Sequence, residues 1–360
     1  MRRMAPLLVL AMALPLACGS GPTASASPSP SPSASAATSA TPSPTANPCL
    51  NPTVTAAAGE PKLVRPAIAY DAARSEDVLF GAPNGNPIPE TWDWTAAAGW
   101  KKLNPSHSPP ARTSASMAYD EATGSIVLFG GQLVGTAATP LTDTWTWDGT
   151  DWTQRNPAKT PPAIVDTSLA YDPLTKTVLA VLDNDTASHT ETWQWDGNTW
   201  SQLQPATAPM WAKRGAGVAF STAVQVMVLF GTVYAIIGPP AEGSTWTYSA
   251  GTWTSHPARA TDPRPRMQPG LAADPGGGVV LFGGGGSGFT AYSETWVWSG
   301  SWQKKAASPA PSKRARPGMA FDSGCKLVLL YGGELQSSAN SNAQYSDTWV
   351  WNGQAWSKVG

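Results

Sequence analysis

Six copies of one short aromatic pattern recur along the chain and restrict how it can fold. The clearest copy is Asp143-Thr-Trp-Thr-Trp-Asp-Gly-Thr-Asp-Trp152. Its large and small side chains alternate as in a β-strand, and Asp148-Gly149 favours a tight hairpin turn. The first tryptophans of the six copies, in steps of 48 to 53 residues, are Trp92, Trp145, Trp193, Trp246, Trp296 and Trp349. The pattern therefore indicates a β-sheet unit that is repeated six times.

Each repeat is interpreted as four antiparallel strands. In the second repeat these are 116–120, 125–131, 143–148 and a strand that begins at Trp152. The second strand is apolar on both faces, which predicts that it lies between packed sheets. One four-stranded sheet cannot cover both of its faces, so the copies must stack, and six whole copies suit a closed ring. We therefore expect an all-β, six-bladed β-propeller with repeats at about 64–111, 112–163, 164–212, 213–264, 265–313 and 314–360.

The tryptophans predict how the blades touch. All 18 tryptophans except Trp211 occupy repeat positions. Burying one tryptophan removes roughly 150–250 Å² from water, so we expect tryptophan burial to be the main cohesive contribution. The tryptophan face of the third strand is expected to pack on the small side chains, such as Thr144 and Thr146, of a neighbouring blade.

The repeat resembles the kelch repeat, which is also found in the central domain of galactose-oxidase-like proteins. The resemblance rests on Phe129-Gly-Gly131, Trp145-Thr-Trp147 and Trp152, and it recurs from about residue 64 to 360. It implies a propeller and leaves the ligand open. Repeats one, three and four depart from the pattern at the end of their second strand, where Ala82, Val181-Leu182 and Thr232 stand at glycine positions.

The N-terminal segment indicates export. Residues 1–17 contain two arginines followed by a short apolar run, which predicts a secretory signal peptide. The run is shorter than the roughly 20 residues that a membrane-spanning helix needs. The junction Leu14-Pro-Leu-Ala-Cys18 resembles a bacterial lipoprotein cleavage box, although Pro15 replaces the usual leucine. The resemblance implies that Cys18 carries lipid; the alternative is ordinary cleavage that releases a secreted protein.

The segment 18–48 is expected to be a disordered tether, because residues 19–47 are almost all Ser, Ala, Pro and Thr. It would hold the propeller, residues 49–360, clear of a membrane that the protein contacts through its N-terminal lipid alone.

Composition and motifs exclude several functions. The chain has 23 Lys and Arg against 24 Asp and Glu, so it lacks the basic excess that nucleic-acid binding requires. A galactose-oxidase-type copper site resembles two His, two Tyr and a Cys, whereas this chain has only His107, His189 and His256. No zinc pattern or phosphate loop is present. We therefore expect no metal, no cofactor and no assigned catalytic residue, and a monomer.

Charged residues recur at the strand entrances. Acids precede Thr-Trp at Glu90, Asp143, Glu191, Glu294 and Asp347. Arginines lie just before the first strand at Arg65, Arg112, Arg214, Arg266 and Arg314. Two interpretations stay open: the acids and guanidinium groups pair around the rim, or the arginines line the mouth of the central channel and bind an anionic group such as a carboxylate. Repeat three has Asp166 and no arginine, which predicts an asymmetric mouth.

Two function hypotheses follow from the rim and its loops. The longest loops, 231–243 and 333–346, join second and third strands, and the first carries Tyr234, which suits a binding surface or packing over the channel. Trp211 either stacks on a sugar or covers a neighbouring blade. The first hypothesis is a non-catalytic module that binds a glycan or a protein. The second is a sugar-converting enzyme, because kelch-like rings include mutarotases that bind sialic acid with Arg and Glu.

Two cysteines remain once Cys18 is assigned to lipid. Cys49 precedes the first blade, and Cys325 lies in a turn of the last blade, and these blades are neighbours in a closed ring. Because thiols pair in an oxidising compartment, we expect a Cys49–Cys325 disulfide that latches the ring. The alternative is that Cys49 belongs to the tether and both thiols are free.

Overall fold

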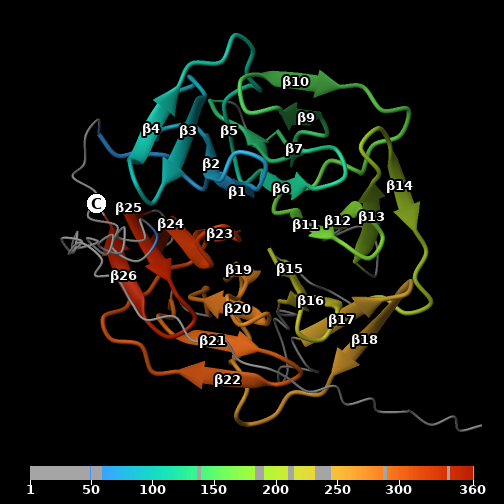
Figure 1. The fold of residues 1–360 in the computed structure, drawn as a ribbon, viewed down its shortest axis with the longest axis vertical. Helices are drawn as coiled ribbons and strands as arrows, with labels where there is room; N and C mark the ends of the chain where they lie inside the picture. Colours follow the sequence, from blue (N-terminus) through green and yellow to red (C-terminus); the bar gives the residue numbers. More distant parts are fainter. Residues whose placement is uncertain are drawn as a thin grey trace, which may run out of the picture. The chain divides into compact units, whose positions relative to one another are not determined.

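The computed structural model describes Cys49 and residues 59–135, 139–182, 190–209, 215–231, 245–286, 290–338 and 341–359. The signal peptide, Cys18 and the tether lie outside these residues. The described residues form six four-stranded antiparallel sheets arranged as the blades of a β-propeller (Figure 1). The six-bladed, all-β prediction is confirmed. Within the described ranges, no helix is long and apolar enough to cross a membrane.

The blades use consecutive strands of the chain. Blade one contains β1 (Ala67–Asp71), β2 (Glu76–Gly81), β3 (Glu90–Thr95) and β4 (Gly99–Leu103). Blade two contains β6 (Ser116–Asp120), β7 (Ser125–Phe129), β9 (Thr144–Trp147) and β10 (Trp152–Arg155), with the short pair β5 (Arg112–Thr113) and β8 (Gln132–Leu133) beside it. Blade three contains β11 (Ser168–Asp172), β12 (Thr177–Leu182), β13 (Glu191–Trp195) and β14 (Trp200–Leu203).

The second half of the ring repeats this order. Blade four contains β15 (Gly217–Ser221), β16 (Val226–Phe230), β17 (Thr245–Ser249) and β18 (Thr252–His256). Blade five contains β19 (Gly270–Ala273), β20 (Val279–Phe282), β21 (Thr295–Trp298) and β22 (Trp302–Lys305). Blade six contains β23 (Gly318–Asp322), β24 (Leu327–Ser338), β25 (Ser341–Trp351) and β26 (Trp356–Val359). Strands β24 and β25 pair from Val328 and Trp351 out to Ser338 and Ser341, so much of the segment 333–346, which the sequence suggested was a loop, is a β-ribbon.

The first strand of each blade faces the centre of the ring and the fourth lies at its periphery (Figure 1). The inner strands contact one another in the order β1, β6, β11, β15, β19 and β23, and β23 contacts β1. Almost all apolar residues of the second strands are buried, as their sequence predicted, and Val226 and Leu335 are half-buried. The hydrophobic core is therefore divided into clusters that lie between adjacent blades. One such cluster joins Ala67 and Phe80 of blade one to Ile126 and Trp152 of blade two.

A ring of buried hydrogen bonds links every blade to the one before it. In each blade the tryptophan at the start of the fourth strand donates its indole N–H to the threonine just before the first tryptophan of the third strand in the preceding blade, at 2.8 to 2.9 Å. The pairs are Trp100 with Thr348, Trp152 with Thr91, Trp200 with Thr144, Trp253 with Thr192, Trp302 with Thr245 and Trp356 with Thr295. The repeated threonine is thus an acceptor for the neighbouring blade. The expected contact between blades is corrected in one respect, because the fourth-strand tryptophan, and not the third-strand one, reaches this threonine.

Closure of the ring uses the same contacts as the other junctions. Blade six takes all of its strands from the C-terminal end, so no strand is exchanged with blade one. Trp100 donates to Thr348, and its ring lies 5.4 Å from that of Tyr331 in an edge-to-face arrangement. Cys49 and Cys325 form a disulfide with a Cα–Cα distance of 5.2 Å, which ties the segment before blade one to blade six.

The disulfide should leave no free thiol at either cysteine. We expect that the unreduced, denatured mature protein shows no reactive Cys49 or Cys325 thiol, and that a non-reducing peptide map links the two segments. Because the bond closes a loop with a sequence separation of 276 residues, Cys49→Ser should lower the free energy of unfolding by up to about 5 kcal/mol. Two titratable thiols at these positions would contradict the latch.

Candidate functional site

Three of the predicted arginines are buried structural groups. Arg112, Arg266 and Arg314 have relative exposures of 1%, 0% and 0%. The Arg112 guanidinium donates to both carboxylate oxygens of Asp143 at 2.6 and 2.7 Å and to the carbonyl of Gly130. Arg314 repeats this arrangement with Asp347 and Gly332. The interpretation that these side chains line the channel mouth is therefore wrong, and the pairing interpretation holds for them.

The pairs hold their acids in the ionised form. Burial opposes ionisation of Glu294, but hydrogen bonds from Lys304 and Arg266 lower its pKa to about 2. Burial likewise opposes ionisation of Asp143 and Asp347. The hydrogen bonds from Arg112 and Arg314 nevertheless hold the pKa of each carboxyl below its ordinary value. Each guanidinium thus joins the segment before the first strand to the start of the third strand of its own blade.

The buried arginines explain the glycine pairs of the repeat. Gly-Gly follows the second strand in blades two and five and lies at a register shift within the longer second strand of blade six, and these are the blades that carry Arg112, Arg266 and Arg314. At Gly284, with φ of 100°, a Cβ atom would lie 2.9 Å from Cδ of Arg266. Any larger residue would therefore displace the arginine. In blade one Leu63 stands at the arginine position, four residues before the first strand, and glycine is replaced by Ala82.

The channel mouth is formed by a different position, two residues before each first strand. One residue from each blade occupies it, and all six have a left-handed backbone, with φ between 45° and 76°. They are Arg65, Ser114, Asp166, Gly215, Gln268 and Arg316, and we call them the channel mouth. Left-handed non-glycine residues cost of order 1–3 kcal/mol each and persist where the surroundings impose them. Here the imposing contacts include backbone hydrogen bonds between blades, from Ser114 to Arg65, Gln268 to Gly215 and Arg316 to Gln268.

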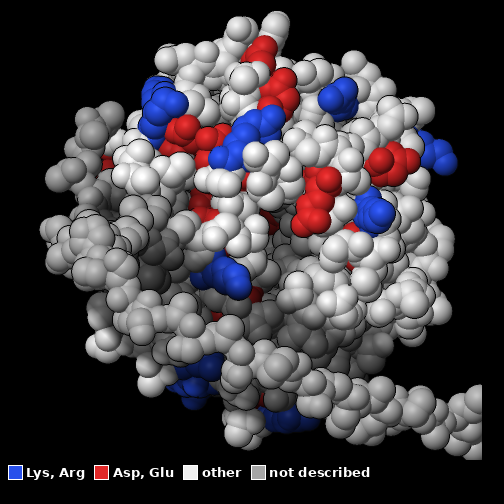
Figure 2. Space-filling view, in the orientation of Figure 1, with Lys and Arg blue, Asp and Glu red and all other residues white. Residues whose placement is uncertain are grey.

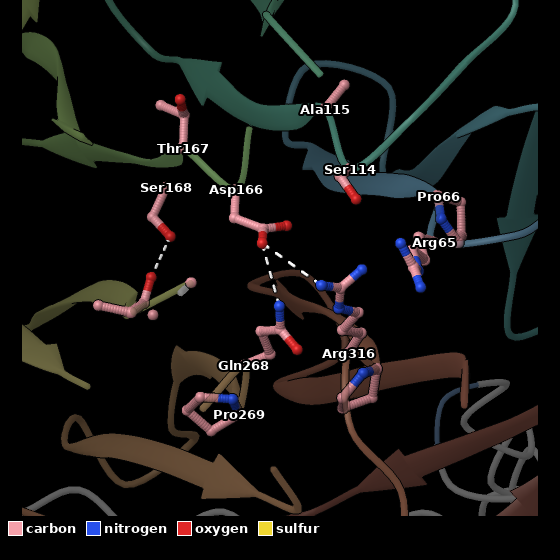
Figure 3. Close-up of a pocket in the computed structure, with 14 residues that line it drawn as sticks. Arg65, Pro66, Ser114, Ala115, Asp166, Thr167, Ser168, Gln268, Pro269 and Arg316 are labelled. Carbon is pink, nitrogen blue, oxygen red and sulfur yellow. Dashed lines mark hydrogen bonds and ion pairs between the residues drawn. The ribbon is translucent and has the colours of Figure 1, made fainter. Parts of the chain in front are cut away.

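The side chains of the channel mouth surround a cavity of about 140 Å³ (Figure 3). Asp166 accepts a hydrogen bond from the Gln268 amide at 3.0 Å, and its carboxylate lies 3.4 Å from the Arg316 guanidinium. Ser168 also lines the cavity and donates to the carbonyl of Ala216. The mouth is asymmetric, as Asp166 indicated in the sequence.

Glu334 on β24 adds a second carboxylate beside the mouth. It accepts two hydrogen bonds from Arg65, at 3.0 and 3.1 Å, and lies 3.6 Å from the Arg316 guanidinium. Burial would raise the pKa of Glu334, but the hydrogen bond from Arg65 and the charges of both arginines lower it below its ordinary value. Its side chain is 7% exposed, whereas Arg65 is 29% exposed and Asp166 18%. Two guanidinium groups and two carboxylates therefore balance in charge at this end of the channel.

The structure places one of the predicted ligand-binding residues at the channel mouth and others away from it. Arg65 lines the channel mouth, and Arg112, Arg266 and Arg314 do not. Arg214, Trp211 and Tyr234 lie outside the described residues. Sequence reasoning missed Gln268 and Arg316, although each precedes a proline just before a first strand, as Arg65 does.

Two further cavities follow the mouth along the channel. The next, of about 160 Å³, shares Pro66, Ser168 and Pro317 with the mouth cavity. A third, of about 220 Å³, shares Ile68 and Leu169 with the second and lies toward the other end of the inner strands. On the face shown in Figure 2, basic and acidic side chains are interspersed among uncharged ones. The described residues contain no group of His, Cys, Asp and Glu that could hold a metal ion.

Comparison with known proteins supports the fold. No protein-family model matches the chain, and no curated protein matches it by sequence. Among solved structures, that of YjhT is similar, with a TM-score of 0.60 and 12% identity over 84% of this chain and 99% of that one. At this identity the likeness shows the propeller fold and carries no information about the ligand.

Proposed function

We propose that the protein is an extracytoplasmic binding propeller whose channel mouth takes one sugar ring of a glycan. The observation that supports this most is the composition of the mouth, where guanidinium and amide donors lie beside the Asp166 carboxylate, and Glu334 next to the mouth completes the charge balance. A sugar hydroxyl both donates and accepts hydrogen bonds, so a mixed set of partners suits it. A cavity of roughly 150 Å³ holds one benzene-sized ring. The cavity at the channel mouth has a similar volume, about 140 Å³.

The charge balance disfavours a ligand that is only an anion. A free carboxylate would have to compete with Asp166 and Glu334 for the same guanidinium groups. A sugar therefore binds most favourably when its hydroxyl groups form hydrogen bonds with these paired groups. An acidic substituent on the sugar is accommodated beside the exposed part of Arg65.

Binding without catalysis is favoured over sugar conversion by the state of Glu334. A general acid works best when its pKa lies near the working pH, whereas the pKa of Glu334 is lowered and its carboxylate is held by two hydrogen bonds from Arg65. Asp166 then remains as the more accessible carboxylate. A bound sugar whose anomeric ratio changes faster by NMR than in buffer would make the sugar-converting enzyme the better interpretation.

Asp166→Asn tests the site. Asparagine keeps the side-chain shape and tolerates the left-handed backbone, so only the charge is removed. After a glycan array has identified a ligand for the wild-type protein, we expect this variant to bind it about 10- to 100-fold more weakly, because a hydrogen bond to a charged group contributes about 1.5–3 kcal/mol. Asp196→Asn, on an exposed turn of the same blade, is the matched control. Absence of glycan binding by the wild type, or equal affinity of both variants, would contradict the proposal.

We also propose that lipid at Cys18 anchors the protein to the membrane. The support is the short apolar run and the Ala17-Cys18 junction in the sequence. Cys18→Ser is expected to release the protein or to leave it uncleaved. Membrane-fraction partitioning and intact mass are the measurements, and a variant that is fully processed yet still partitions into detergent would contradict a lipid anchor.

A further inference from the structure

Aromatic side chains line the end of the channel away from the mouth. The fourth residue of the first strand is aromatic in five blades: Tyr70, Tyr119, Tyr171, Phe220 and Phe321. All five line the cavity of about 220 Å³, which we call the aromatic basin. Blade five has Ala273 at this position and leaves a gap in the ring of aromatics.

These aromatics also pack between blades, and that packing accounts for part of their burial. Tyr70 and Phe220 are buried in the clusters that join neighbouring blades, whereas Tyr119, Tyr171 and Phe321 are only half-buried. The Tyr70 hydroxyl accepts a hydrogen bond from Gly324 N–H of blade six. The half-buried rings therefore supply the aromatic surface that a ligand in the basin contacts.

The basin is electrically negative. Among the described residues that line it, Glu121, which is exposed, carries a charge. The residue after each tyrosine, Asp71, Asp120 or Asp172, is a buried carboxylate at the end of its strand. The Arg74 guanidinium lies 2.7 Å from Asp71 and offsets that one charge.

Burial and these negative charges raise the pKa of two of the tyrosines. Burial raises the pKa of Tyr171, and the negative charges of Glu121, Asp120 and Asp172 raise it further. Burial and the charge of Asp71 raise the pKa of Tyr119 in the same way. Carboxylates belonging to two adjacent blades thus act on one cavity.

We propose that the aromatic basin binds an organic ammonium ion with apolar substituents, such as a quaternary ammonium group. Aromatic faces attract cations. An alkylated ammonium ion holds its water less tightly than a metal ion does, so enclosing it among aromatic rings costs less desolvation free energy. Apolar walls formed by Met117, Leu169 and Met319 contact the alkyl groups, and Glu121 supplies the opposite charge. The site is separate from the channel mouth and does not depend on sugar binding there.

Choline and 3,3-dimethylbutan-1-ol test the proposal, because they have the same shape and differ in charge. By isothermal titration of the full chain, we expect choline to bind with a Kd on the order of 1 mM or tighter. The uncharged alcohol should bind at least about fivefold more weakly, since each aromatic ring contributes about a two- to fivefold preference for the cation. Equal affinities, or no saturable binding of choline at roughly ten times that concentration, would overturn the proposal.

Variants locate the site. Glu121→Gln changes an exposed side chain and should weaken choline binding about threefold without affecting folding. Tyr171→Leu keeps apolar bulk while removing the ring, and should weaken it about two- to fivefold. Asp166→Asn in the channel mouth is the control and should leave choline binding unchanged. Choline binding that is lost in Asp166→Asn, or unaltered in both basin variants, would place the cation elsewhere and overturn the proposal.

Discussion

Replacing Trp200 with alanine is expected to lower the free energy of unfolding by about 3–5 kcal/mol. The side chain is 1% exposed, donates its indole N–H to Thr144 of the preceding blade, and lies 5.2 Å from the Phe129 ring. The substitution thus removes a large buried surface, an aromatic contact and a hydrogen bond at one junction. The midpoint of urea unfolding, at an unchanged slope, is the measurement.

Two further variants separate the contributions at this junction. Thr144→Val leaves the indole N–H buried without its acceptor, which should cost about 1–3 kcal/mol. Trp100→Ala makes the same change at the junction between blades one and six, the first and last blades of the ring. We expect it to cost as much as Trp200→Ala. A cost below about 1 kcal/mol for both tryptophan variants would show that these contacts do not hold the blades together.

Arg112→Met should be the second strongly destabilising change. It removes the guanidinium that donates to the Asp143 carboxylate and the Gly130 carbonyl, so that the Trp145 indole N–H remains as a donor to Asp143, while it keeps much of the apolar volume. Removing one partner of a buried ion pair typically costs about 3–5 kcal/mol, and because Asp143 is 19% exposed we expect about 2–4. Arg155→Met in the same blade is the control, since Arg155 is exposed and makes one hydrogen bond, to Thr146. Its cost should stay within about 1 kcal/mol.

The arginine pairs should also make stability depend on pH in the acid range. Their carboxyl groups have a lower pKa in the folded protein than in the unfolded chain, so their contribution is present above the unfolded pKa and is lost as pH falls through the folded one. For Glu294 this range runs from its ordinary 4.5 down to about 2. The difference in unfolding free energy between wild type and Arg266→Met should therefore shrink across this interval. A difference that stays constant from pH 6 to about pH 2 would contradict this assignment.

The ring could be predicted from the sequence because each of the six copies of the tryptophan pattern predicts the same β-sheet unit. The channel mouth could not be predicted in the same way, because its six residues have the same left-handed backbone conformation but no residue type common to all of them: Arg65, Ser114, Asp166, Gly215, Gln268 and Arg316. Sequence reasoning groups Arg65 with Arg112, but Arg65 lies two residues before its first strand and Arg112 lies four residues before its own. One of these points into the channel and the other is buried within a blade, so similar side chains acquired opposite roles.

The aromatic basin shows a different limit of sequence reasoning. The first strands repeat Ala-Tyr-Asp or Ala-Phe in most blades, and the structure places these strands at the centre of the ring. Alternation in one strand does not reveal that five aromatic residues from five blades reach one cavity, because that follows from ring closure.

The side-chain amide of Gln268 offers the most direct test of sugar binding at the channel mouth. It donates to Asp166 at 3.0 Å within the cavity, and its two amide protons are observable by ¹⁵N-resolved NMR. Titration with the monosaccharide selected by the glycan array should shift this resonance saturably, with the same Kd as calorimetry, and Asp166→Asn should reduce the shift at equal sugar concentration. Saturable binding of the sugar without a shift of the Gln268 amide resonance would contradict sugar binding at the channel mouth and place the ligand elsewhere on the propeller.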